Sequence, residues 1–228
     1  MRDLFGTGLQ VDQSKGPAKE KAEDSNTGKE IAVKRSRTVH YERRVRSEMF
    51  LEDRLPWHFE TGASYHCFSF GDVDALTYLR AVLKQQPLEY VLMSTFSMSM
   101  VDAKCLEKWV EAGLIGSLDL YLGELFDSKF TEVYLAMREL LCKTGRGRVA
   151  VFRNHSKVMA MFGERFDVAV ESSANLNSNP RCEQTCLTID TGVARFYKEE
   201  VFDCIKSFNH DYDDWKPYVL KRDRLEQT

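Results

Sequence analysis

Short apolar runs alternate with amphipathic stretches along the chain from about Tyr65 onward. The runs are rich in Val, Leu, Phe and Tyr, a composition typical of buried β-strands. The intervening segments repeat apolar side chains at helical spacing, as Leu76, Leu79 and Val82 do. Asp102 is positioned to cap one of these helices. The pattern predicts strands at 65–70, 89–96, 117–122 and 148–152, and helices at 73–85, 102–113 and 130–142.

The alternation changes after Phe152. Two apolar runs, 157–162 and 166–173, flank Gly163-Glu164-Arg165, which predicts a β-hairpin. The order of elements favours an α/β fold with a mixed, largely parallel sheet and helices on both faces. The remaining predicted elements are a strand at 186–190 and a helix at 198–209.

Composition divides the chain into parts of different character. Residues 1–46 are polar and poor in aromatics, so they bury too little apolar surface to offset their ordering entropy, and we expect a flexible tail. Its last part, 34–46, is a basic arm. A connector at 47–64, an α/β domain at 65–210 and a polar C-terminal tail at 211–228 complete the expected organisation.

The overall composition is that of a globular protein. The 228 residues are 43% hydrophobic and 29% charged, which excludes a fully disordered chain. The formal charge of −3 excludes a histone-like, uniformly basic nucleic-acid binder. No apolar run reaches the ~18 residues of a membrane span, and the N-terminus lacks the apolar stretch of a signal peptide. We therefore expect a cytoplasmic protein with no membrane partner.

The cysteines are scattered and suggest reduced thiols rather than a disulfide framework. Only Cys182 and Cys186 are close, as C-x3-C, and the second pair that a structural zinc site usually needs is missing. We expect no metal and no cofactor. The other cysteines are Cys67, Cys105, Cys142 and Cys204.

The basic arm has two interpretations. It is a solvated charged connector, or it neutralises phosphates and steers a polyanion such as DNA to the protein. Glu42 is its single acid. Its six cations are the candidate nucleic-acid contacts Lys34, Arg35, Arg37, Arg43, Arg44 and Arg46.

The candidate chemistry lies in and after the predicted hairpin. His155 and Lys157 are two residues apart, so their side chains share a face if they begin a strand. Ser173 and Asn175 have the same relation at the end of the partner strand, and a turn near Gly163 brings the two ends together. An ammonium, a hydroxyl and a carboxamide suit a phosphate, and an imidazole can attack phosphorus or transfer protons.

This segment resembles the HKD motif of the phospholipase D superfamily, H-x-K followed by D and then G-S-x-N. The resemblance rests on His155-Ser156-Lys157 and Ser172-Ser173-Ala174-Asn175. It implies that His155 is the nucleophile of a phosphohistidine intermediate, that Lys157 and Asn175 hold phosphate oxygens, and that Ser173 supports them. It also implies that Glu183 orients the histidine. The wider stretch, with NPRCEQ, is similar to a group of phage and prophage phospholipase-D-like proteins.

The chain departs from the motif at defined positions. Phe162 stands where the motif has its Asp, Asp167 lies beyond the turn, and Ser172 replaces the glycine. The span from His155 to Ser173 is 18 residues, longer than the usual motif. Loss of the Asp bears on catalysis more than on fold.

The resemblance also implies an oligomeric state. The mechanism needs two histidines, but the chain has one H-x-K, and relatives with one motif pair two subunits. We therefore expect a C2 homodimer with a composite site and a metal-independent reaction. Arg153 and Arg181 flank the motif and extend a phosphate track, or are solvated. After an apolar strand, three hydroxyl residues line the same cleft or cap the next helix, namely Ser94, Thr95 and Ser97.

Three functions follow in order of preference. The first is a metal-independent phosphodiesterase, a nuclease acting on DNA. The second is a phospholipase-D-like protein that binds nucleic acid without turnover, which Phe162 motivates. The third, a lipid phosphodiester hydrolase, ranks last because the chain shows no amphipathic basic helix or lipidation signal.

Overall fold

The computed structural model describes residues 51, 54–69, 73–177, 181–206 and 216–225. The strands are β1 (Ser64–Ser69), β2 (Leu88–Thr95), β3 (Ile115–Gly123), β4 (Val149–Phe152), β5 (Val158–Gly163), β6 (Asp167–Ser172) and β7 (Glu183–Thr188). The helices are α2 (Ala75–Leu83), α3 (Met100–Glu111), α4 (Thr131–Leu141), α5 (Thr191–Arg195) and α6 (Lys221–Leu225), with a 3₁₀ turn at Glu124–Asp127 and a π-helical stretch at Phe196–Phe202.

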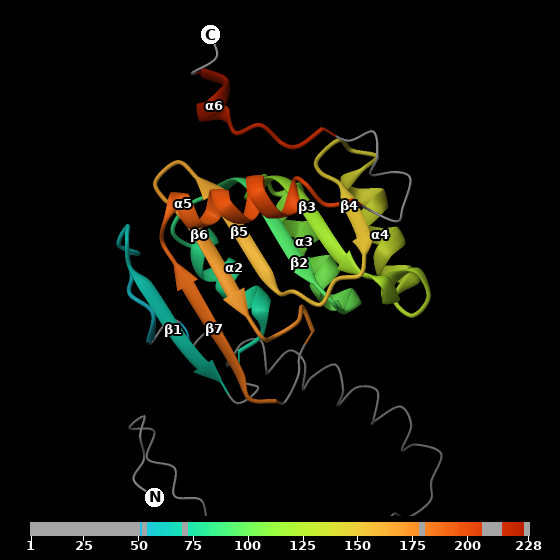
Figure 1. Ribbon diagram of the computed structural model, residues 1–228, viewed down its shortest axis with the longest axis horizontal. Coiled ribbons are helices and arrows are strands. Elements are labelled where there is room, and N and C mark those ends of the chain that lie inside the picture. The colour runs from blue at the N-terminus through green and yellow to red at the C-terminus, as the bar shows by residue number, and fades with distance from the viewer. Residues whose placement is uncertain (1–50, 52–53, 70–72, 178–180, 207–215, 226–228) are drawn as a thin grey trace, which may run out of the picture. The chain divides into compact units, whose positions relative to one another are not determined.

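The strands form one seven-stranded mixed sheet in the order β1-β7-β6-β5-β2-β3-β4 (Figure 1). The pairs β2–β3 and β3–β4 are parallel, and β5 runs antiparallel to β2. The predicted hairpin is β5–β6. The α/β class is therefore confirmed. β1 does not pair with the parallel strands. It lies at the edge of the sheet and pairs with β7, which in turn pairs with β6 of the hairpin.

Helices cover both faces of the sheet, as expected. In Figure 1, α5 lies in front of the sheet, while α2, α3 and α4 lie behind it. The core behind the sheet includes Leu79 and Leu106, and the core in front includes Tyr121 and Phe202. The inner strands are apolar on both sides because both sides are covered.

Two helices begin at residues other than those expected. The N-cap of α3 is Ser99, and Asp102 occupies the third helical position, where it completes a capping box with Ser99. The helix predicted at 198–209 begins instead at Thr191, because Asp190 accepts a hydrogen bond from the Val193 N–H, and the π-helical stretch ends at Phe202. The last strand begins at Glu183 rather than at Cys186.

Segments outside the expected domain contribute to its core. Leu51 and Phe59 of the expected connector are buried. From the expected C-terminal tail, Leu220 is buried and Tyr218 stacks on Tyr90 with ring centroids 4.7 Å apart. Arg222 forms an ion pair with the buried Asp167 at 2.7 Å. Within the described ranges, no helix has the length and apolar character needed to cross a membrane.

A network of charged side chains is buried in front of β3 and β4. The Arg148 guanidinium is 2.7 Å from Asp119 and 2.7 Å from Asp203, and it donates to the Tyr121 hydroxyl at 2.9 Å. Lys198 completes the charge balance, because its ammonium lies 2.6 Å from the second oxygen of Asp203. Two acids and two bases thus compensate one another out of water.

Candidate active site

The strand directions bring the candidate residues to one edge of the sheet. β2 and β3 end at this edge, and β5 starts there because it is antiparallel to β2, with Val158 opposite Ser94. β6 ends there and β7 starts there, with Ser172 opposite Thr185. The β4–β5 loop, which holds the H-x-K residues, runs along this edge, the lower one in Figure 1.

His155 and Lys157 lie together, but not as side chains of one strand. β5 begins only at Val158, so the expectation that both residues occupy a strand face is wrong. Lys157 instead turns back on the loop, where its ammonium donates to the His155 carbonyl and lies 3.0 Å from Nδ1 of the ring. His155 is exposed and Lys157 is half-buried. Reactive imidazole and ammonium therefore share one polar, accessible surface.

Asn154 anchors this loop to the sheet, and no motif in the sequence singles it out. Its amide nitrogen donates to the Tyr121 carbonyl at 2.9 Å and to Ser94 Oγ at 3.0 Å. Its oxygen accepts from the Ser156 N–H at 2.9 Å. The side chain is buried, so these bonds are not shared with bulk water. Asn154 thus fixes the position of Ser156, which lies between His155 and Lys157 in the chain.

Ser94, expected to line the cleft or cap a helix, takes a different role. Besides accepting from Asn154, its hydroxyl donates to the Ser156 carbonyl at 3.2 Å. Thr95 donates to the Ser97 carbonyl at 2.8 Å. Ser94, Thr95 and Ser97 are buried, so they do not line an open cleft, and Ser94 supports the loop through its bonds to Asn154 and Ser156.

The serine and glutamate of the motif form a pair beside Lys157. Ser173 Oγ donates to Glu183 and accepts from the Gln184 N–H at 3.1 Å. Partial burial lowers the pKa of Lys157 below its ordinary value, and the negative charge of Glu183 opposes that shift. Glu183 therefore acts on Ser173 and Lys157, and no bond between Glu183 and His155 occurs in the part of the chain that the structure describes.

Asn175 is held next to Phe96, whose ring contacts His155. Its Oδ1 accepts from the Phe96 N–H at 3.2 Å and lies 3.3 Å from Thr95 Oγ1, whose proton is donated to the Ser97 carbonyl. Since a backbone N–H can only donate, the bonded atom is the oxygen, and the amide nitrogen is the donor left for a ligand. The Phe96 ring lies 4.8 Å from the His155 ring, centroid to centroid. All the motif residues are thus linked by contacts around one small region.

The position of Phe162 shows where the Asp of the motif would lie in this fold. It is five residues beyond Lys157 along β5, about 16 Å at ~3.3 Å per residue. It is buried in the core in front of the sheet, opposite Asp167 on β6. Asp167 is bonded to Thr191 at 2.8 Å and to Arg222, away from the reactive end of the strand. Replacing the Asp therefore removes no group from the phosphate side of the hairpin.

The remaining predicted residues fall into separate classes. Arg153 and Arg181 are exposed on either side of the motif in sequence. The basic arm 34–46 lies outside the described residues. Cys182 precedes β7 and Cys186 lies inside it, on an extended backbone that separates them. Within the described ranges, no group of three or more His, Cys, Asp or Glu side chains is placed to hold a metal ion.

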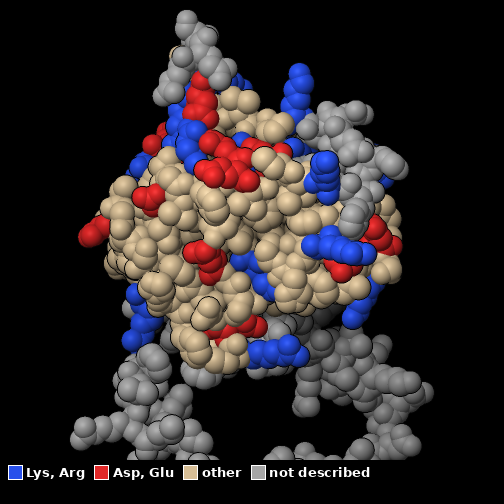
Figure 2. All heavy atoms as spheres, in the orientation of Figure 1, with Lys and Arg blue, Asp and Glu red and all other residues tan. Residues whose placement is uncertain are grey.

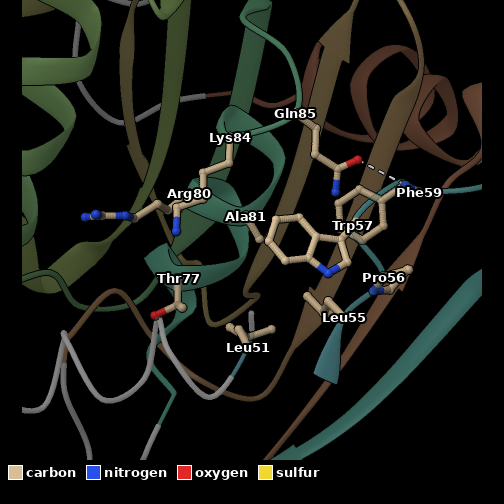
Figure 3. A pocket seen from close by; sticks show the side chains of 10 residues that line it. All are labelled: Leu51, Leu55, Pro56, Trp57, Phe59, Thr77, Arg80, Ala81, Lys84 and Gln85. Carbon is tan, nitrogen blue, oxygen red and sulfur yellow. Dashed lines mark hydrogen bonds between the residues drawn. The ribbon is translucent and has the colours of Figure 1, made fainter. Parts of the chain in front are cut away.

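A cavity of about 410 Å³ lies away from these residues (Figure 3). It is formed between Leu51, residues 55–59 and the outer surface of α2, with Trp57 and Ala81 among its walls. The Phe59 N–H donates to Gln85 at 3.0 Å beside it. The lining is mainly apolar and contains none of the motif residues. This cavity therefore adds no residue to the candidate site.

Comparisons with known proteins identify structures of similar fold. No family model matches the chain, and a search of curated proteins found no match. The chain is similar to NucT from Helicobacter pylori, at 15% identity, 61% of this chain, 94% of that chain and a TM-score of 0.47. It is similar to the archaeal chromatin protein TrmBL2, at 10% identity, 77% of this chain, 64% of that chain and a TM-score of 0.45.

A third similar structure is the phosphatidylserine synthase of Haemophilus influenzae Rd KW20. The identity is 15%, the match covers 60% of this chain and 37% of that chain, and the TM-score is 0.44. The function proposed below rests on this chain's own side chains.

Proposed function

We propose that this chain is a metal-independent phosphodiesterase that cleaves nucleic acid, with DNA as the expected substrate. The observation that carries the proposal is the Lys157 ammonium, 3.0 Å from Nδ1 of His155, with Ser173 and Glu183 paired beside it. Asn175 adds an amide donor whose oxygen is fixed by the Phe96 N–H. A nucleophile next to a cation and neutral donors suits an anionic phosphodiester.

The reaction proceeds in two displacements. Nε2 of His155 attacks phosphorus, the bond to the leaving oxygen breaks, and that oxygen takes a proton from a second, protonated imidazole. Water then gives a proton back to this second imidazole and attacks the phosphohistidine, which releases a monoester and restores His155. Lys157 and Asn175 hold the non-bridging oxygens throughout. Ser173 supports them because its hydroxyl proton holds Glu183 beside Lys157.

Substrate binding has to move Lys157. An ammonium can only donate, so in the ligand-free geometry Nδ1 accepts and Nε2 carries the ring proton. Attack by Nε2 needs that proton on Nδ1 instead. A phosphate oxygen that draws Lys157 away from the ring permits this change, and the exposed ring exchanges its proton with solvent.

The second imidazole comes from another copy of the chain. Each protomer supplies one H-x-K, and His155 is exposed at the edge of the sheet. A C2 homodimer that places two His155 side chains on one phosphate provides both the nucleophile and the acid.

The polyanion is expected to follow the strand-end edge rather than the face covered by α5. Figure 2 shows basic and acidic side chains interspersed on that face, with no large area of one sign. Lys157 and the exposed Arg153 and Arg181 supply positive charge near the motif. Contacts of this kind bind phosphates without reading sequence.

The test is cleavage of plasmid, single-stranded DNA and RNA by the full chain in EDTA. We expect products ending in a phosphomonoester, and a dimer in solution at the concentrations that cleave. A protein that cleaves none of these substrates, yet binds DNA with a steep salt dependence, is the binding module without turnover and contradicts the proposal.

The charge of Glu183 should set the alkaline limit of anion binding. Because its negative charge raises the pKa of Lys157 against the effect of burial, Glu183→Gln is expected to lower that pKa further. In the variant, Lys157 then loses its proton at a lower pH than in the wild type. The site therefore also releases its bound anion at a lower pH. Thermal stabilisation by sulfate, measured across alkaline pH, reports this limit.

The matched control is Glu164→Gln in the exposed turn between β5 and β6, which should leave the limit in place. An alkaline limit that stays unchanged in Glu183→Gln, or moves upward, would show that Lys157 does not hold the anion.

A further inference from the structure

Phe96 presents an aromatic ring at the reactive histidine. It follows the last residue of β2, and its ring lies 4.8 Å from the His155 ring at an interplanar angle of 47°. The side chain is only partly buried. Its own N–H is bonded to Asn175 Oδ1, so the backbone under the ring is tied to the residue that donates to phosphate. An apolar ring therefore lies next to the polar side chains of His155 and Asn175.

Gly123 provides the space that the ring occupies. A Cβ at this position would lie 2.8 Å from Cδ2 of Phe96 and 2.9 Å from the Asn154 carbonyl oxygen. These separations are shorter than van der Waals contact, so any larger residue at the end of β3 would displace the ring or the loop that carries His155. The ring is therefore packed against the end of β3 and tilted beside the imidazole, and part of its surface stays accessible.

A phenyl ring has no hydrogen bond to offer to a phosphate, but it has a face on which a planar group can stack. We propose that Phe96 is the stacking platform for a nucleobase next to the scissile phosphate, which makes unpaired, single-stranded nucleic acid the preferred substrate. In a duplex the face of a base is covered by its neighbours, whereas single strands offer it to aromatic side chains. This inference deepens the proposed function and rests on it.

The experiment compares two oligonucleotides of equal length and charge, one of thymidines and one of abasic sites. Wild type, Phe96→Leu and Phe96→Trp are measured for KM and kcat, and for binding by fluorescence anisotropy. Stacking predicts that Phe96→Leu raises KM for the thymidine strand by about 5- to 150-fold while the abasic strand is unaffected. Phe96→Trp should keep the preference for bases.

Phe196→Leu is the matched control, because the Phe196 ring is exposed to solvent but lies on the π-helical stretch, away from His155. Equal losses on both strands in Phe96→Leu would mean that the ring only positions His155, and no loss on either would mean that it contacts nothing; each result overturns the proposal. If the wild type cleaves neither strand, the phosphodiesterase proposal fails, and the ratio of the two binding constants still tests the stacking.

Discussion

Alanine in place of His155 is expected to reduce phosphodiester cleavage in EDTA by at least ~10³-fold, because removing a nucleophile eliminates the covalent route rather than weakening a contact. The exposed ring contributes little to the core, so the variant should unfold at nearly the wild-type temperature. The rate is measured on single-stranded DNA under conditions where the wild type turns over.

His66→Ala is the matched control. His66 is exposed on β1 and its Nε2 lies 3.9 Å from Cys186, away from the motif. It should leave the rate unchanged. If His155→Ala and wild type cleave at similar rates, a different group is the nucleophile and the proposed mechanism is wrong, whatever the fold.

Mixed dimers extend the same experiment to the composite site. A dimer of one wild-type and one His155→Ala chain has a nucleophile or an acid, but not both. Titrating the variant into the wild type should therefore lower activity faster than dilution alone, approaching the square of the wild-type fraction when subunits exchange freely. A linear decrease would indicate that each chain works alone.

The sequence predicts most of this site because the motif is carried by a hairpin. The apolar runs on both sides of the turn at Gly163 predict two adjacent strands, and once these pair, the residues just outside them meet at one end. The prediction fails at the detail of Lys157, which reaches His155 by folding back along a loop. Side-chain proximity in a loop depends on its anchors, and here the anchor is Asn154.

Asn154 shows why some of the site escapes sequence reasoning. Its partners, the Tyr121 carbonyl and Ser94, are separated from it by 33 and 60 positions and become neighbours only when β2, β3 and the loop assemble. The edge position of β1 escapes it for the same reason. Local periodicity identifies a strand but not the strand that pairs with it. The partner of β1 is β7, which lies more than 100 residues further along the chain.

The largest effect on stability is expected in the buried charge network of Arg148, Asp119, Asp203 and Lys198. Arg148→Met keeps much of the side-chain length but leaves Asp119 and Asp203 without their shared cation. The charge left on Asp119 would be neither solvated nor ion-paired, whereas Asp203 would keep its ion pair with Lys198. Breaking a buried ion pair by removing one partner costs about 3–5 kcal/mol. Out of about 5–15 kcal/mol for a domain, this is a large fraction.

The loss should depend on pH in a defined direction. Burial raises the pKa of Asp119, and Arg148 opposes this shift, so without Arg148 the pKa rises further. A folded-state pKa above the unfolded value means that the folded protein binds more protons, and its stability falls as pH rises from the unfolded pKa to the folded one. Urea unfolding should therefore show a larger deficit for Arg148→Met near neutral pH than in mild acid.

Lys143→Met is the control for removing a cation, because its ion pair with Glu139 is solvent-exposed on both sides. It should change the free energy of unfolding by less than about 0.5 kcal/mol. A comparable small change in Arg148→Met would mean that the two carboxylates find water or other donors once the guanidinium is gone. The network would then not be what fixes the helical layer of α5 and the π-helical stretch onto β3 and β4.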